Sequence, residues 1–261
     1  MNQLLKVAMR AAREAGDLIC HDFRHLAASD IQVKSKNDFV TRVDREAEVI
    51  IKGTIRQNFP DHRTLAEESG YSAKAGEYLW VIDPLDGTTN FIHGIAHFAI
   101  SLALLKKEKT VFALIYDPMS KDCFHAAAGQ GAFLNGKAIT VNRVAELSSA
   151  LGATGFPFKA PRFLAAYTET FRSLLSQCKD MRRCGSAALD LAYTACGRYD
   201  FFWEAHLLPW DFMAGKLLVA EAGGHVSDFS GSELAVRTSS VLAANGVLHL
   251  LLHDLIGKFF K

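Results

Sequence analysis

The chain has 261 residues, of which 49% are hydrophobic and 22% charged, so it can bury a core, and a disordered chain is excluded. Its 29 Lys and Arg residues balance 28 Asp and Glu residues, so no basic surface indicates direct nucleic-acid binding. The composition also excludes a membrane span.

The N-terminal segment begins with an amphipathic pattern. The apolar residues of this segment are interrupted by Lys6, Arg10 and Arg13, whereas a signal peptide has a continuous apolar core. We therefore expect a cytoplasmic protein. The pattern predicts a helix from the first turns to Leu26. The five cysteines are odd in number and contain no C-x-x-C pair, which predicts neither disulfide bonds nor a zinc site.

The first half of the chain predicts two helices and several strands. A second helix is expected from Thr41, with Asp44 in a capping box, to near Pro60. A short strand over 64–66 precedes Glu67 and Glu68. Further apolar runs predict strands joined as a meander, over 79–82, 98–105, 111–116 and 123–127. We interpret the glycine-rich segment 129–137 as a turn.

The pattern changes after residue 142. Three predicted helices, over 162–177, 186–196 and 210–222, alternate with strands near Leu151, Phe201 and His225. We therefore predict an N-terminal α+β half over 1–142 and a C-terminal α/β half over 143–261, which together can also be described as one domain.

The most informative segment is WVIDPLDGTTNF, residues 80–91. An apolar strand ends there in Asp83 and Asp86, at the position where an α/β sheet exposes side chains to a ligand. The amides of Gly87, Thr88 and Thr89 then lie at a predicted helix start, which favours an anion such as phosphate.

Two carboxylates in such proximity repel by roughly 4 kcal/mol at 4 Å and an intermediate dielectric, so they need protons or cations. Glu67, Glu68 and Asp211 offer further oxygen ligands. An all-oxygen set favours Mg²⁺ or Mn²⁺ over zinc.

Each of these residues also has an ordinary structural interpretation. Asp44 and Ser186 can cap helices, Asp211 can be an N-cap, Asp83 can form a turn before proline, and Glu67 and Glu68 can be a solvated pair. We interpret three histidines near the motifs as packing or hydrogen-bonding residues: His93, His97 and His206. The stretch 201–204 is interpreted as a core strand with Glu204 at its end.

Four segments in this order resemble the inositol monophosphatase family, especially its bacterial members. They are EES at 67–69, WVIDPLDGTTNF at 80–91, CGSAALDLAY from Cys184 and PWDFMAGKLLVAEAGG from Pro209. The resemblance covers nearly the whole chain. It implies an α/β fold, the layered αβαβα sandwich shared with fructose-bisphosphatases, and a Mg²⁺-dependent, lithium-sensitive phosphatase that forms a homodimer.

The resemblance also implies residue roles. Glu67, Asp83 and the Leu85 carbonyl would hold one Mg²⁺, and Asp83, Asp86 and Asp211 a second, with a weaker third ion near Glu67. Thr88 and Glu67 would position the attacking water, with Asp44 supporting Thr88. The amides of Gly87 and Thr88 would bind phosphate. Substrate hydroxyls would meet Asp86, Gly185, Ser186, Ala187, Glu204 and Asp211.

The implied reaction is hydrolysis of a small phosphate monoester, myo-inositol 1-phosphate, to inositol and phosphate by metal-activated water. Several alternatives stay open. The chain can be a related sugar-phosphate or nucleotide phosphatase, acting on fructose 1,6-bisphosphate, histidinol phosphate or a 3′,5′-bisphosphate nucleotide. It can also combine the phosphatase fold with a regulatory protein-binding role.

Overall fold

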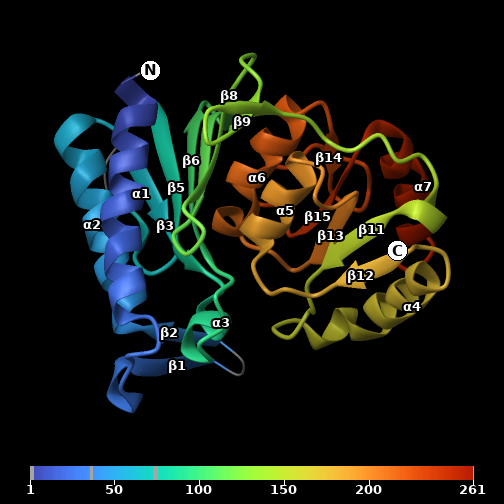
Figure 1. The fold of residues 1–261 in the computed structure, drawn as a ribbon, viewed down its shortest axis with the longest axis horizontal. Helices are drawn as coiled ribbons and strands as arrows, with labels where there is room; N and C mark the ends of the chain where they lie inside the picture. The colour runs from blue at the N-terminus through green and yellow to red at the C-terminus, as the bar shows by residue number, and fades with distance from the viewer. Residues whose placement is uncertain (1–2, 36–37, 73–75, 261) are drawn as a thin grey trace.

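The computed structural model describes residues 3–35, 38–72 and 76–260. Five layers follow one another in space (Figure 1). Helices α1 (Gln3–Asp22) and α2 (Arg42–Asn58) cover one face of an eight-stranded sheet. Helices α5 (Ala187–Ala195) and α6 (Pro209–Glu221) lie between this sheet and a five-stranded one, which α4 (Leu164–Leu175) and α7 (Gly246–Ile256) cover from outside. The predicted αβαβα sandwich is confirmed.

The large sheet is mainly a meander. Its order is β10 (Lys137–Ile139), β9 (Ala132–Leu134), β8 (Asp122–Ala127), β7 (Lys109–Asp117), β6 (Ala99–Lys106), β5 (Tyr78–Asp86), β3 (Arg63–Ala66) and β4 (Gly70–Tyr71). Only β3 and β5 pair in parallel among these described strands. The predicted meander is confirmed. The turn predicted over 129–137 is wrong in part, because β9 and the start of β10 form a hairpin whose strands are too short for a readable alternation.

The smaller sheet runs β12 (Asp180–Arg182), β11 (Leu151–Thr154), β13 (Phe201–Ala205), β15 (Ser240–Ala244) and β14 (His225–Ser227). Phe201, Phe202 and Trp203 are fully buried, so the predicted core strand is confirmed. The sequence analysis missed β12, β15 and α7. In α7, apolar residues face both the core and solvent, so no clean helical period marks it.

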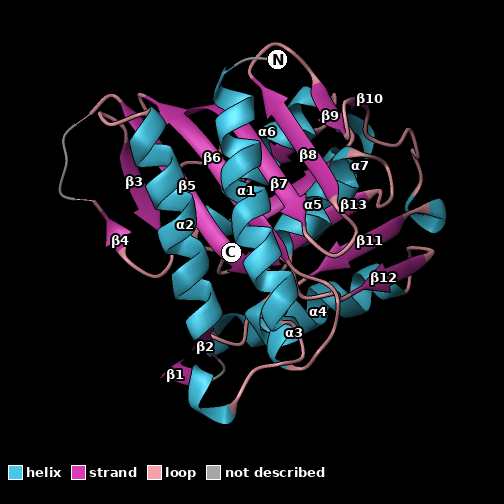
Figure 2. Ribbon diagram, turned by 60° about the vertical axis from the view of Figure 1, so that its left-hand side comes forward, coloured by secondary structure: helices cyan, strands magenta, loops and turns pink. Residues whose placement is uncertain are grey.

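The helix predictions hold apart from their ends. Figure 2 shows α1 and α2 side by side over the large sheet. The first helix ends at Asp22 rather than Leu26, because Arg24 adopts a left-handed conformation with φ of 65°. Short elements complete the fold: β1 (Ile31–Ser35), β2 (Asp38–Thr41), α3 (Thr88–Ile92) and 3-10 turns at Ala28–Asp30, Leu147–Ser149 and Pro161–Phe163.

Burial explains the layers. Trp80, Ile82 and Leu102 pack toward α1 and α2, whereas Val81 and Ala103, their strand neighbours, pack toward α5 and α6. Apolar residues on both faces allow the large sheet to be covered on both sides. The boundary at 142 falls in the connection between β10 and β11, and the division into halves stays a prediction. No described helix is long and apolar enough to cross a membrane.

Candidate active site

Strand β5 carries the first two carboxylates on a β-bulge. Asp83 pairs with Ser101 and Asp86 with Ala99, so one extra residue lies between them on β5. Residues three apart on a regular strand point to opposite faces, and the bulge lets both carboxylates turn to one side. The Leu85 amide donates to Asp83 Oδ1 over 2.9 Å and fixes that carboxylate.

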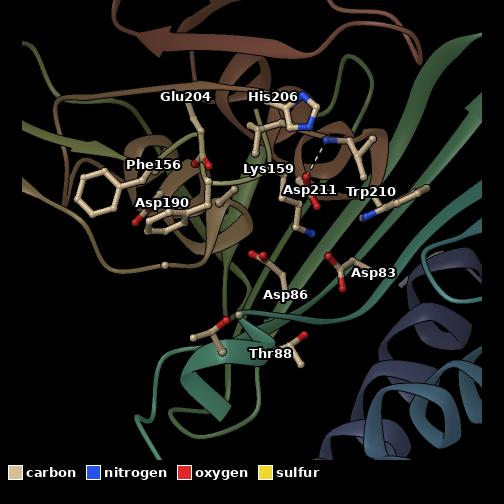
Figure 3. A pocket seen from close by; sticks show the side chains of 18 of the residues that line it. Asp83, Asp86, Thr88, Phe156, Lys159, Asp190, Glu204, His206, Trp210 and Asp211 are labelled. Carbon is tan, nitrogen blue, oxygen red and sulfur yellow. Dashed lines mark hydrogen bonds between the residues drawn. The ribbon is translucent and has the colours of Figure 1, made fainter. Parts of the chain in front are cut away.

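Helix α6 supplies the third carboxylate from far along the chain. Asp211 lies in its first turn and accepts a 2.7 Å hydrogen bond from the Leu208 amide. Asp83, Asp86 and Asp211 each offer a carboxylate oxygen, and these oxygens lie within 4.8 Å of one another. Figure 3 shows Asp83 and Asp86 facing Asp211 across the cavity. The predicted convergence of these segments is therefore present.

The three carboxylates lack sufficient neutralising charge. Burial and neighbouring carboxylates raise the pKa of Asp83 and that of Asp211 well above the usual range. Burial also raises the pKa of Asp86 to about 6, although its hydrogen bonds from Ser186 and Ala188 lower it. Divalent cations satisfy such a set, and an all-oxygen donor set fits Mg²⁺. The side chains present thus match the predicted metal.

Glu67 approaches the same cavity from the end of β3. Its pKa is raised to about 7, mainly by burial, with Lys34 lowering it and the charge of Glu68 raising it. Lys34 Nζ lies 3.4 Å from Glu67 Oε1 and 2.6 Å from Glu68 Oε1. Glu68 is therefore an ion-pair partner of Lys34, and Glu67 is the acid that lines the cavity. No pattern in the sequence analysis pointed to Lys34, which lies on β1.

Buried Asp44 and half-buried Thr88 form a pair behind the carboxylates. Thr88 Oγ1 lies 2.9 Å from Asp44 Oδ1 and 3.1 Å from the Leu85 carbonyl oxygen, and it can donate to either. The other oxygen of Asp44 accepts from the Thr41 amide at 2.8 Å and from the Thr41 hydroxyl at 2.6 Å. Burial raises the pKa of Asp44. The side chain therefore caps α2 and contacts Thr88 at the same time.

The opposite wall comes from the segment before α5. Ser186 caps α5 by accepting from the Leu189 amide and also donates to Asp86 Oδ2 at 2.5 Å. The Ala188 amide donates to the same oxygen at 2.8 Å. Gly185 has φ of 93°, a conformation that glycine adopts without strain. Asn90, which the sequence analysis did not single out, fixes this segment by donating to the Cys184 carbonyl at 2.8 Å.

Glu204 lies on this wall at the end of β13. Burial raises its pKa to about 8, although Arg183 lowers it. A Cβ atom on Gly155 would overlap its carboxylate, so the site needs glycine there. Figure 3 shows Glu204 above Asp190 and apart from the Asp83 and Asp86 pair.

The whole site surrounds a cavity of about 470 Å³, which suits a small ligand. It is also lined by residues that the sequence analysis did not assign to it: Phe156, Lys159, Arg183, Asp190, His206 and Trp210. His206, interpreted from sequence as a packing residue, lines this cavity with φ of 68°. Asp190 and Trp210 lie in α5 and α6, and the other four lie on connections whose course the local sequence does not reveal.

Comparisons with known proteins agree with this geometry. The model of the inositol monophosphatase family matches residues 1–258. Nus factor SuhB of Escherichia coli K12 is 48% identical over 246 residues, which cover 94% of this chain and 92% of that protein. Extragenic suppressor protein suhB of Bartonella henselae superposes with a TM-score of 0.93 at 36% identity, covering 98% of this chain and 99% of that one. An inositol monophosphatase from Anabaena (Nostoc) superposes with a TM-score of 0.86 at 38% identity, covering 98% of this chain and 96% of that one. The chain belongs to the inositol monophosphatase family.

Proposed function

We propose that the protein is a Mg²⁺-dependent phosphatase that hydrolyses inositol monophosphates. The observation that carries the proposal is the convergence of Asp83, Asp86 and Asp211 within 4.8 Å, at the wall of a cavity of ligand size. The solved Anabaena relative bears the name inositol monophosphatase, which supports the substrate class.

The carboxylates divide into two overlapping ligand sets. Asp83 belongs to both, together with Glu67 and the Leu85 carbonyl in one set and with Asp86 and Asp211 in the other. When bound, Mg²⁺ would neutralise charge on the phosphate and lower the pKa of a coordinated water. Mn²⁺ prefers similar oxygen ligands and can serve as a substitute. A third ion near Glu67 stays part of the proposal.

Thr88 and Glu67 orient the attacking water. Since the Thr88 proton is directed at Asp44 or at the Leu85 carbonyl, its oxygen lone pairs are left to accept a hydrogen bond from that water. Glu67 accepts a second one. The amides of Gly87 and Thr88 bind phosphate oxygens. Phosphoryl transfer depends mainly on such positioning, so a nucleophilic side chain is not required.

The other wall recognises the alcohol part of the ester. Glu204 and Ser186 are placed to meet hydroxyl groups, together with the backbone at Gly185 and Ala187. Arg183 also lines the cavity and influences both Asp86 and Glu204 electrostatically. Selection among phosphate esters therefore resides in residues of the second half of the chain.

The test is phosphate release from a panel of esters with and without Mg²⁺. Suitable substrates are myo-inositol 1-phosphate, fructose 1,6-bisphosphate, histidinol phosphate and adenosine 3′,5′-bisphosphate. We expect the highest kcat/KM with inositol 1-phosphate and no turnover after chelation. A preference for another ester would support the phosphatase activity but would contradict the proposed substrate.

Asp83→Asn provides the matched variant, because it retains the shape of the side chain and removes the charge shared by both ligand sets. We expect turnover to fall by at least about 1000-fold, the scale of losing a catalytic electrostatic group. Near-normal Mg²⁺-dependent activity of this variant would refute the assignment. Asp122→Asn, which breaks an exposed pair with Arg198, is the control and should retain activity.

A second role is favoured by the relatives named Nus factor SuhB. We propose that this chain also has a transcription-related function that acts through protein contacts. The balanced charge gives no indication of direct nucleic-acid binding. That this chain does not bind nucleic acid directly stays a prediction. Affinity capture with wild type and Asp83→Asn separates the roles, since a role independent of catalysis predicts the same partners for both proteins.

A further inference from the structure

A second cluster of potential metal ligands borders the cavity through Asp190. His97, Cys184 and Asp190 each offer one ligand atom, and these atoms lie within 4.8 Å of one another. His97 lies between α3 and β6, Cys184 precedes α5, and Asp190 lies within α5. The sequence analysis predicted no zinc site from the cysteines, and His97 lies far along the chain from Cys184 and Asp190.

Two of these side chains have buried polar atoms that lack partners. His97 Nε2 and Asp190 Oδ1 form no hydrogen bond with any of the described residues. Asp190 is only 1% exposed, although it lies at the wall of the cavity. Leaving such a group unsatisfied costs about 1–3 kcal/mol, and more when it is charged. A bound species that contacts both atoms would remove this cost.

The donor set identifies the class of that species. Imidazole nitrogen, thiolate sulfur and carboxylate oxygen together favour Zn²⁺, whereas the catalytic set consists of oxygen alone. Tetrahedral zinc holds its ligand atoms roughly 3.3–3.8 Å apart, which falls within the 4.8 Å limit. A thiolate and a carboxylate would also neutralise the ion. The Tyr199 hydroxyl lies 3.5 Å from Cys184 Sγ.

The surrounding backbone is already held in place. Asn90 donates to the carbonyl of His97 at 2.7 Å and to that of Cys184 at 2.8 Å. One amide group thus ties together the two segments that carry these ligands. Little backbone movement is then needed to close the side chains around an ion.

We propose that His97, Cys184 and Asp190 form a second metal site, distinct from the acidic one, that takes Zn²⁺ or another thiophilic divalent cation. The ion would fix the segment leading to Ser186, which donates to Asp86. It would therefore stabilise the substrate wall without contacting the phosphate.

The test uses Co²⁺ as a spectroscopic probe on chelator-treated full-length protein in excess Mg²⁺. We expect a thiolate-to-Co²⁺ charge-transfer band with tetrahedral d–d bands, and displacement of both by one equivalent of Zn²⁺. Cys184→Ser should lose the charge-transfer band and weaken Zn²⁺ binding more than about tenfold in competition with a chromophoric chelator. His97→Gln should weaken it likewise, which provides a second variant if the first does not fold.

Cys196→Ser is the matched control, because Cys196 is also partly buried but bonds only the Tyr193 carbonyl in the described structure. It should retain both bands and the Zn²⁺ affinity. Absence of a charge-transfer band in wild type would overturn the proposal. So would a band that persists in Cys184→Ser, or Zn²⁺ binding that only Asp83→Asn reduces.

Discussion

Glu204 illustrates how a single residue depends on a neighbour far away in sequence. Its buried carboxylate occupies space that a side chain at position 155 would fill. The raised pKa, about 8, shows that few charges compensate its burial. We therefore regard Glu204 as a substrate contact and Gly155 as the residue that leaves room for it.

At this scale we predict that Glu204→Ala reduces discrimination among phosphate esters more than it reduces the chemical step. The ratio of kcat/KM between inositol 1-phosphate and a non-polyol ester should fall about tenfold, the loss of one hydrogen bond to a charged group. Gly155→Ala should act in the same direction by displacing the carboxylate. An unchanged ratio across the ester panel would count against this role.

Gly53→Ala is the control for the glycine substitution. Gly53 lies in α2, and a Cβ atom there would meet no atom within 4 Å. Alanine is favoured over glycine in helices by about 1 kcal/mol. The ester ratio should therefore stay unchanged, and stability should not fall.

At the scale of elements, the start of α2 is also part of the site. Thr41 Oγ1 accepts from the Val43 amide at 3.1 Å and from the Asp44 amide at 3.4 Å, and its hydroxyl donates to Asp44. The same carboxylate accepts from Thr88. A local helix signal therefore sets the position of a side chain that we propose supports catalysis.

We predict that Thr41→Ala lowers the free energy of unfolding by about 1–2 kcal/mol, the usual cost of losing an N-cap. It should also lower kcat, because Asp44 loses two of the contacts that orient it toward Thr88. Chemical denaturation and steady-state kinetics measure the two effects. Full kcat in a destabilised variant would show that Thr41 serves only the helix.

Thr168→Ala is the matched control for this change. Thr168 is exposed on α4, and among the described residues its hydroxyl bonds only the Leu164 carbonyl, within its own helix. Its removal should change stability by no more than about 0.5 kcal/mol and leave kcat unaltered.

At the scale of the whole molecule, the fold brings like charges together from three segments. Glu67, Asp83, Asp86 and Asp211 all have raised pKa values because burial disfavours their charged forms. A carboxyl group whose pKa is higher in the folded than in the unfolded chain binds more protons when folded. Its stabilising effect is present at low pH and is lost as pH rises through the folded pKa.

We therefore predict that the metal-free protein loses stability as pH rises above about 4.5, where unfolded glutamates ionise. The loss should continue to about 7 for Glu67 and to about 8 for Glu204. Mg²⁺ should restore stability mainly at the upper end, by about 2.7 kcal/mol at 100 times its Kd. Thermal melts with Mg²⁺ or chelator across this range measure the difference.

The contribution of the acidic site can be isolated with Asp83→Asn. This variant should be less sensitive to pH when metal-free and should gain little from Mg²⁺. Equal Mg²⁺ stabilisation at low and high pH in wild type would contradict the predicted link between ionisation of these carboxyl groups and stability.

The sequence alone determined the elements with long, regular patterns. Amphipathic spacing predicted α1 and α2, the apolar runs predicted the meander, and the DPLDGTTN segment predicted the carboxylates of β5. These signals are local, since helix and strand periods repeat within a few residues. Short elements such as β9 and β12 left no comparable pattern.

Only the tertiary structure decided which distant residues meet. The bulge turned Asp83 and Asp86 to one side, and packing of α6 against the large sheet brought Asp211 to them. Packing of α5 against the same sheet brought Cys184 to His97. The reason is physical: burial of apolar faces fixes how layers stack, and side chains on separate layers become neighbours only after the layers have stacked.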